Sequence, residues 1–158
     1  MENKQETERV ENINLKKANA EDADSILAVE KSLEDAKTYS ALKSKEEIME
    51  EIYKNFFYLI EQENKIVGDV SYEMKSENHA YISGLVVAPK FQGQGIARQA
   101  MEIILAELKN IKIIDLVTHP ENKKAIKLYE SLGFKKAGEP MENYFNDGEP
   151  RIKMVLEK

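Results

Sequence analysis

The sequence predicts an α/β (mixed α+β) fold. In this fold a twisted mixed sheet of about seven strands carries helices on both faces, which gives three layers. Three observations lead to this prediction. The chain has 158 residues, a length typical of one domain. Expected hairpins toward both ends require antiparallel neighbours, whereas a strand–helix–strand unit between them requires parallel ones. No segment repeats, so repeat architectures are excluded.

Hydrophobic periodicity and capping residues place the elements in order. Ser44, with Glu47 three residues later, predicts a capping box, and Gln62-Glu63-Asn64 predicts a hairpin turn. Gly133 is expected to end a helix, and Asn146-Asp147-Gly148 to form a tight turn. The expected strands are residues 13–17, 56–61, 65–74, 80–87, 111–118, 134–145 and 151–156. The expected helices are residues 19–33, 44–54, 95–109 and 121–132.

Composition limits the classes of function. The net charge is −6 and no basic stripe is evident, so nucleic acid is not an expected partner. No apolar run approaches the ~20 residues that span a bilayer, so no membrane partner is expected. Residues 1–12 lack a secretion signal and are expected to form a flexible tail before a single domain at 13–158. The absence of cysteine excludes disulfides, thiolate nucleophiles and cysteine-ligated zinc, and we expect a cytoplasmic protein without a metal.

The most informative stretch runs from Leu85 to Arg98. A β-branched run ends at Pro89, and a short loop with Gly93 and Gly95 leads into a helix. This arrangement exposes backbone N–H groups at a helix N-terminus and favours an anion such as phosphate. The loop lacks the Gly-Lys-Ser/Thr ending of a nucleotide-triphosphate loop and the glycine spacing of a dinucleotide site. From these residues alone, a plain structural connection is the alternative.

Three pieces of the chain together resemble the GNAT superfamily of acyl-CoA-dependent N-acyltransferases. Gln92-Gly93-Gln94-Gly95-Ile96-Ala97 fits the family's Arg/Gln-x-x-Gly-x-Gly/Ala loop, and the strand Leu85-Val86-Val87 lies directly before it. Residues 122–134 fit the motif Asn-x-x-Ala-x-x-Leu-Tyr-x-x-x-Gly-Phe. The motifs occur in the expected order, each on the expected element. The resemblance covers residues 13–158, of which 13–79 match only in the order of elements.

The resemblance implies that acetyl-CoA binds where the strands 80–87 and 111–118 splay apart. The N–H of Val87, or of a neighbour in 85–87, would then polarise the thioester carbonyl, and residues 92–97 would hold the pyrophosphate. The cofactor-binding residues implied in this way are Leu85, Val86, Val87, Gln92, Gly93, Gln94, Gly95, Ile96, Ala97 and Asn122. Asn122 would contact the pantetheine arm, although an N-cap role explains it equally well.

The resemblance assigns the acid of the reaction to Tyr129, which would protonate the departing thiolate. A buried aromatic residue on an amphipathic helix is the alternative explanation. The base is not assigned, because Ser83 and Val117 occupy the positions where relatives carry a glutamate. The remaining candidates are Glu73, His79, Tyr81, His119 or a chain of waters.

The implied activity is direct transfer of an acetyl group from acetyl-CoA to a primary amine of a small molecule or peptide. The segments 34–55 and 138–150 are expected to shape the acceptor pocket. Both are rich in acidic residues, which suits a cationic amine, although solvated helix faces explain them as well. A non-catalytic CoA-binding or sensor domain on the same fold is the alternative. A homodimer is compatible with the resemblance.

Overall fold

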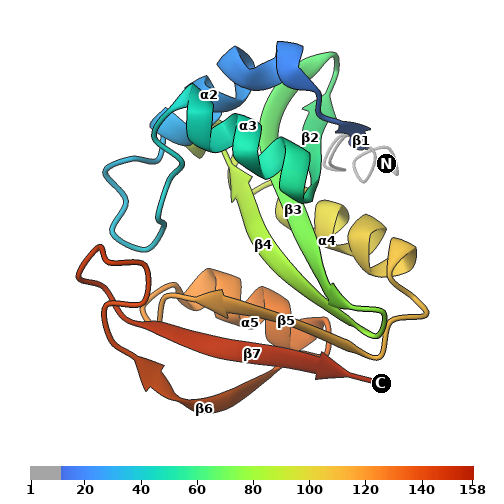
Figure 1. The fold of residues 1–158 in the computed structure, drawn as a ribbon, viewed down its shortest axis with the longest axis vertical. Helices are drawn as coiled ribbons and strands as arrows, with labels where there is room; N and C mark the ends of the chain where they lie inside the picture. The colour runs from blue at the N-terminus through green and yellow to red at the C-terminus, as the bar shows by residue number, and fades with distance from the viewer. Residues whose placement is uncertain (1–11) are drawn as a thin grey trace, which may run out of the picture.

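The computed structural model describes residues 12–158, and its seven strands form one mixed sheet (Figure 1). The strand order is β1-β2-β3-β4-β5-β7-β6. Only the β4–β5 pair is parallel among these described strands. The strands are β1 Asn14–Lys17, β2 Phe56–Gln62, β3 Lys65–Ser76, β4 His79–Val87, β5 Ile113–Thr118, β6 Lys135–Met141 and β7 Arg151–Glu157. The predicted fold class is confirmed, whereas most of the predicted tail lies outside the described residues.

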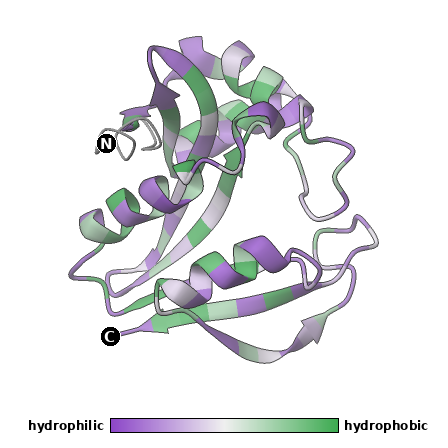
Figure 2. Cartoon of the chain, turned by 180° about the vertical axis from the view of Figure 1, so that it is seen from behind, coloured by the Kyte–Doolittle hydropathy of each residue, from purple (hydrophilic) through white to green (hydrophobic). Residues whose placement is uncertain are grey.

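Helices cover both faces of this sheet. They are the 3₁₀ turn η1 Ala20–Asp22, α2 Ala23–Lys31, α3 Lys45–Lys54, the 3₁₀ turn η2 Pro89–Phe91, α4 Ile96–Glu107 and α5 Lys123–Ser131. One face carries α2 and α3, which pack through Ile26 and Ile48 against Phe57 and Leu59. The opposite face carries α4 and α5 in the larger apolar cluster (Figure 2), where hydrophobic and hydrophilic residues alternate along both helices. No helix of residues 12–158 is long and apolar enough to cross a membrane.

Local sequence signals explain most element ends. Ser44 accepts a hydrogen bond from the N–H of Glu47 at 3.1 Å, as expected for the start of α3. The hairpin between β2 and β3 turns at Glu63 and Asn64, whose φ angles are 52° and 65°. Two left-handed residues in a row match the twist of the flanking strands. Gly133, at φ 103°, follows α5 as predicted.

The region between β6 and β7 differs from the prediction. The expected strand to residue 145 ends at Met141, and residues 142–150 form a long loop rather than a tight turn. The side chain of Asn143 accepts a hydrogen bond from the N–H of Gly148 at 2.6 Å, and Asp147 accepts one from the N–H of Glu149 at 3.0 Å. These local bonds satisfy backbone groups that a longer strand would otherwise pair.

A β-bulge in the middle of β4 marks the place where the sheet opens. Ile82 and Gly84 pair with successive residues of β3, so Ser83 is one extra residue in β4. A bulge bends its strand and increases the local twist. The last residue pair between β4 and β5 joins Tyr81 to Asp115, just before the bulge. Beyond this point the two strands diverge (Figure 1).

Gly68 allows β3 to lie close to the end of β4. A Cβ atom added at Gly68 would lie 2.1 Å from the carbonyl oxygen of Val86, a contact that only a backbone shift can relieve. We therefore expect Gly68→Ala to lower the free energy of unfolding by about 1–3 kcal/mol, measured by chemical denaturation. Gly84→Ala is the matched control, since its Cβ would meet only the Ser71 hydroxyl at 3.2 Å. Equal losses in both variants would contradict the close approach at Gly68.

Candidate active site

A cleft of about 1100 Å³ occupies the opening between β4 and β5 and extends along α3 and over the N-terminus of α4. Ten of the eleven residues predicted for cofactor binding or catalysis line it. They are Leu85, Val86, Val87, Gln92, Gly93, Gly95, Ile96, Ala97, Asn122 and Tyr129. Gln94 does not line it. The structure thus brings the predicted residues to one place, and their roles stay predictions.

The glycine loop ends at the N-terminus of α4. Gly93 and Gly95 have φ angles of 82° and 81°, in the left-handed region where a side chain is strained. The helical hydrogen bonds begin with the N–H of Gln99, which donates to the carbonyl of Gly95 at 3.1 Å. The preceding N–H groups of the first helical turn therefore have no intrahelical acceptor, and with the helix dipole they favour an anion. The Gln92 side chain donates to the carbonyl of Val87 at 2.8 Å and ties the loop to β4.

The end of β4 presents unpaired backbone to the cleft. Residues 82–87 have no partner in β5, whereas on their other side they pair with β3. The side chains of Val86 and Val87 are buried on opposite faces of the sheet, in different apolar clusters. Packing therefore fixes this segment while its free edge remains available to a ligand that pairs like a strand.

Tyr129 lies on α5 with its ring against Phe134, at a centroid distance of 5.9 Å in an edge-on arrangement. Burial raises the pKa of the phenol to about 12, so that it stays protonated at neutral pH. Its side chain is 8% exposed and lines the cleft. Tyr129 is thus a core aromatic residue that also lines the cleft, and its role as the acid stays a prediction.

Asn122 is the N-cap of α5. Its Oδ1 atom accepts a hydrogen bond from the N–H of Ala125 at 3.2 Å. The capping explanation is therefore correct. Because capping uses only the side-chain oxygen, the amide nitrogen can still donate to a ligand, and Asn122 lines the cleft.

Ser83 and Val117, which stand where the resemblance would place a glutamate, both line the cleft. The hydroxyl of Ser83 is 2.8 Å from that of Ser71, and Val117 is apolar. Among the other candidates, Glu73 and Tyr81 line the cleft. Burial raises the pKa of the Tyr81 phenol, so this group stays protonated at neutral pH and cannot take up a proton there.

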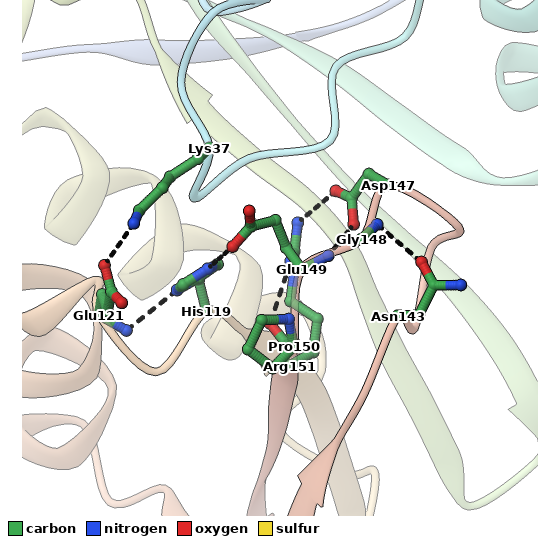
Figure 3. Close-up of polar contacts among 9 residues, drawn as sticks. All are labelled: Lys37, His119, Glu121, Asn143, Asp147, Gly148, Glu149, Pro150 and Arg151. Carbon is green, nitrogen blue, oxygen red and sulfur yellow. Dashed lines mark hydrogen bonds and ion pairs between the residues drawn. The ribbon is translucent and has the colours of Figure 1, made fainter.

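The two histidines do not line the cleft. His79 starts β4, before the strands diverge, and its Nε2 lies 2.9 Å from Asp115. His119 follows β5 but is 1% exposed. Its Nδ1 accepts from the N–H of Glu121 at 3.0 Å, and its Nε2 lies 2.7 Å from Glu149 (Figure 3). Both ring nitrogens have partners, so this arrangement does not favour His119 as the base.

His119 instead belongs to a network of polar contacts that joins three loops (Figure 3). Lys37, in the loop between α2 and α3, pairs with Glu121 at 2.9 Å. That hydrogen bond raises the pKa of Lys37 and lowers that of Glu121. Arg151 pairs with Asp147 at 3.1 Å within the loop 142–150. The network fixes how the loops of the expected acceptor pocket sit relative to β5.

His119→Asn tests this structural role. Asparagine keeps an acceptor near the Nδ1 position for the Glu121 N–H but loses the contact with Glu149. We expect a lower melting temperature. Loss of a general base lowers kcat by about 10²-fold, and we expect a far smaller decrease of kcat in His119→Asn. A decrease of about 10²-fold with an unchanged melting temperature would restore His119 as the base.

Sequence reasoning missed a pair of buried carboxyl groups in the cleft. Glu30 on α2 is 0% exposed and Asp69 on β3 is 2% exposed, and both line the cleft. Ile60 of β2 pairs with Gly68 and Glu61 pairs with Ile66, so Val67 is one extra residue in β3. This bulge turns the side chains of Val67 and Asp69 to opposite faces of the sheet. Strict alternation would put them on one face. The signal available in the sequence was Asp69 itself, an acidic residue inside an apolar strand.

Comparison with known proteins agrees with this geometry. The sequence model of the acetyltransferase (GNAT) family matches residues 26–134, more than half of the chain. The chain belongs to the GNAT acetyltransferase family.

This GNAT protein matches curated relatives over part of their length. It is 32% identical over 77 residues to spermidine N(1)-acetyltransferase of Escherichia coli K12, covering 46% of this chain and 41% of that protein. It is 33% identical over 78 residues to N-alpha-acetyltransferase 30 of Saccharomyces cerevisiae, covering 48% and 44%. The matched region thus spans less than half of each relative.

Solved structures share its GNAT fold over nearly their whole length. The ribosomal-protein-S18-alanine N-acetyltransferase of Escherichia coli has a TM-score of 0.77 at 22% identity and covers 92% of this chain and 93% of that one. A GNAT family acetyltransferase of Elizabethkingia anophelis with acetyl-CoA bound has a TM-score of 0.72 at 22% identity, covering 93% and 99%. At these identities the likeness shows the fold.

Proposed function

We propose that this protein is an N-acetyltransferase that transfers an acetyl group from acetyl-CoA directly to a primary amine of a small molecule or peptide. One observation carries the proposal: the unpaired edge of β4, the free N–H groups of α4 and the Tyr129 side chain line a single cleft. We further propose that the enzyme works in the cytoplasm.

The residues present fit acetyl-CoA. Its pyrophosphate would lie against the N–H groups of residues 93–97, where two left-handed glycines keep the backbone accessible. Its pantetheine arm would pair with β4 beyond Tyr81, with the Asn122 amide nearby. Arg98 and Lys124 line this half of the cleft and suit its negative charge. Acetyl-CoA supplies an activated acetyl thioester.

The chain's own groups then have distinct tasks. The N–H of Val87 or of a neighbour in 85–87 would donate to the thioester oxygen and stabilise negative charge there. The Tyr129 hydroxyl would donate a proton to the leaving sulfur. Burial raises the pKa of the Tyr129 phenol, and apolar surroundings raise the pKa of a thiol in the same way. The pKa values of the two groups therefore stay close to each other. With no cysteine in the chain, direct transfer is favoured over a thioester on the protein.

The acceptor half of the cleft is acidic. Its charged residues on α2, α3, β3 and the loop between the helices are Glu30, Asp35, Lys43, Glu47, Glu50, Glu51, Lys54, Asp69 and Glu73. This excess of carboxylates favours a positively charged acceptor. An ammonium-bearing acceptor is also consistent with the spermidine, N-alpha and ribosomal-protein-alanine acetyltransferases to which the chain is similar.

The missing carboxylates at Ser83 and Val117 favour the second candidate, a CoA-binding sensor without catalysis. A thiol-release assay with acetyl-CoA and a panel of primary amines, including diamines, arylamines and short peptides, separates the two. We expect turnover with at least one cationic amine. Tight CoA binding in a calorimeter without thiol release from any amine would support the sensor instead.

A further inference from the structure

Within residues 12–158, the buried carboxyl group of Glu30 has hydrogen-bond donors but no ion-pair partner, and that of Asp69 has an oxygen atom with neither. Glu30 accepts hydrogen bonds from the Tyr39 hydroxyl and the Leu42 N–H, both at 2.9 Å. Asp69 Oδ2 is buried and has no hydrogen-bond partner within residues 12–158. A buried polar atom without a partner is costly and marks a site for a ligand or a proton.

These carboxyl groups are not compensated by a cation within the part of the chain that the structure describes. There, neither Glu30 nor Asp69 forms an ion pair, and neither does Glu51 on α3. The titratable groups that face Asp69 are Glu30 from α2, Glu51 from α3 and Tyr39 from the loop between them. All three are acidic or neutral. The site is therefore complementary to a single positive charge.

The pair lies beside the expected acyl position. Asp69 is the Cα partner of Val86 across the β3–β4 ladder, and Gly68 is the partner of Val87. Directly opposed residues point to the same face, and Val86 packs with Val29 and Leu33 of the α2 side. Asp69 therefore approaches the end of β4 from the face opposite α4 and α5, within the acidic half of the cleft.

We propose that the Glu30–Asp69 pair binds the reacting ammonium group of the acceptor and that Asp69 takes up its proton. This inference rests on the proposed acetyltransferase function and deepens it by naming the proton acceptor. It places the base on β3 and α2, and not at Ser83 or Val117 on the central strands.

The proton balance closes without another reagent. One proton moves from the ammonium nitrogen to an Asp69 oxygen, which frees the nitrogen lone pair. The C–N bond forms and the C–S bond breaks, and the Tyr129 hydroxyl gives a proton to the sulfur. The second proton from the nitrogen restores the Tyr129 hydroxyl. Asp69 then releases its proton to solvent, so each turnover forms an amide, a thiol and one proton.

The environment of Asp69 suits this task. Burial raises its pKa well above the ordinary value, and the nearby charge of Glu30 raises it further. A carboxyl group with a raised pKa is a stronger base than a solvated one, which is what transfer from an ammonium ion requires. An arriving ammonium group also supplies the positive charge that favours the ionised pair.

The decisive experiment compares two amines with two variants. Asp69→Asn removes the proton acceptor with little change of shape, and Asp115→Asn is the control, since Asp115 is another buried carboxylate outside the cleft lining. We expect Asp69→Asn to lower kcat/KM by about 10²-fold or more for an alkyl diamine, which is protonated at neutral pH. For an arylamine, which is neutral there, the loss should be at least about tenfold smaller. Asp115→Asn should affect both amines alike.

If Asp69→Asn lowers kcat/KM equally for the two amines, or leaves kcat/KM for the diamine unchanged, the proposal is overturned. Glu30→Gln, which keeps an acceptor for Leu42, should show the same preference for the arylamine if Asp69→Asn does not fold. The diamine and the arylamine are therefore chosen from the panel amines that the wild-type protein acetylates, and absence of thiol release from every amine of the panel would refute the proposed function itself, and with it the role of the pair. Turnover without amine discrimination would refute only the role of the pair.

Thermal unfolding without acetyl-CoA gives an independent readout. Because the folded pKa of Asp69 is raised, its contribution to stability is present below the unfolded value of about 3.9 and is lost as pH rises through the folded value. The amide introduced by Asp69→Asn does not ionise. We therefore expect this variant to melt at a higher temperature than wild type at alkaline pH, with the difference shrinking toward acid pH. Parallel curves for the two proteins would contradict the titration of Asp69 that the proposal requires.

Discussion

Replacing Gly95 with aspartate is expected to reduce the affinity for CoA by about 10²-fold or more. The new carboxylate would lie among the N–H groups that α4 offers to the pyrophosphate and would repel it. Loss of charge-assisted hydrogen bonds of about 1.5–3 kcal/mol alone corresponds to about ten- to 150-fold in affinity. An acidic side chain at a helix N-terminus is favourable for the helix itself, so we expect α4 to remain folded. Titration calorimetry with CoA measures the effect.

Gly138→Asp is the matched control for this experiment. Gly138 has the same φ of 81° as Gly95, open space around its Cβ position and a place on β6 outside the cleft lining. It therefore carries the backbone strain without the phosphate contacts. An unchanged CoA affinity in Gly95→Asp, or an equal loss in both variants, would contradict the assignment of the loop.

Replacing Tyr129 with phenylalanine is expected to lower kcat by about 10²-fold and to leave the affinity for CoA unchanged. The ring and its edge-on contact with Phe134 remain, so only the hydroxyl proton is lost. Because the phenol pKa is about 12, wild-type activity should show no loss of the acid below that pH. Steady-state kinetics and calorimetry together separate the two effects.

Tyr58→Phe is the control for Tyr129→Phe. The pKa of Tyr58 is also raised to about 12, and its hydroxyl donates to Glu107 at 2.9 Å on α4, outside the cleft lining. Tyr58→Phe therefore removes a phenol whose pKa is also raised but which has no role at the site. Equal kcat values for Tyr129→Phe and wild type would return Tyr129 to a purely structural role.

Local signals were sufficient for the proposed cofactor half of the site. The glycine loop 92–97 and the motif 122–134 consist of residues close in sequence, and each acts through the helix that it starts or forms. Their order along a strand–helix–strand–helix unit is enough to bring them to one cleft. For this reason ten of the eleven predicted residues meet there.

The proposed acceptor half depends on contacts between distant elements. The bulges at Val67 and Ser83 arise in pairing between strands and reverse the faces that simple alternation assigns. The burial of His119 depends on the loop 142–150, which folds on its own side chains where a strand was expected. Asp69 meets Glu30 only after α2 packs on β3. None of these contacts has a short-range signature in the sequence.

A single-turnover reaction with acetyl-CoA and a primary diamine tests the central claim most directly. Released thiol, acetylated amine and the intact mass of the protein are measured from the same sample. We predict that thiol and acetylated amine appear in equal amounts and that the mass of the protein does not change. Bound acetyl-CoA with neither product, thiol without acetylated amine, or an acetyl group retained on the protein would contradict direct transfer to an amine.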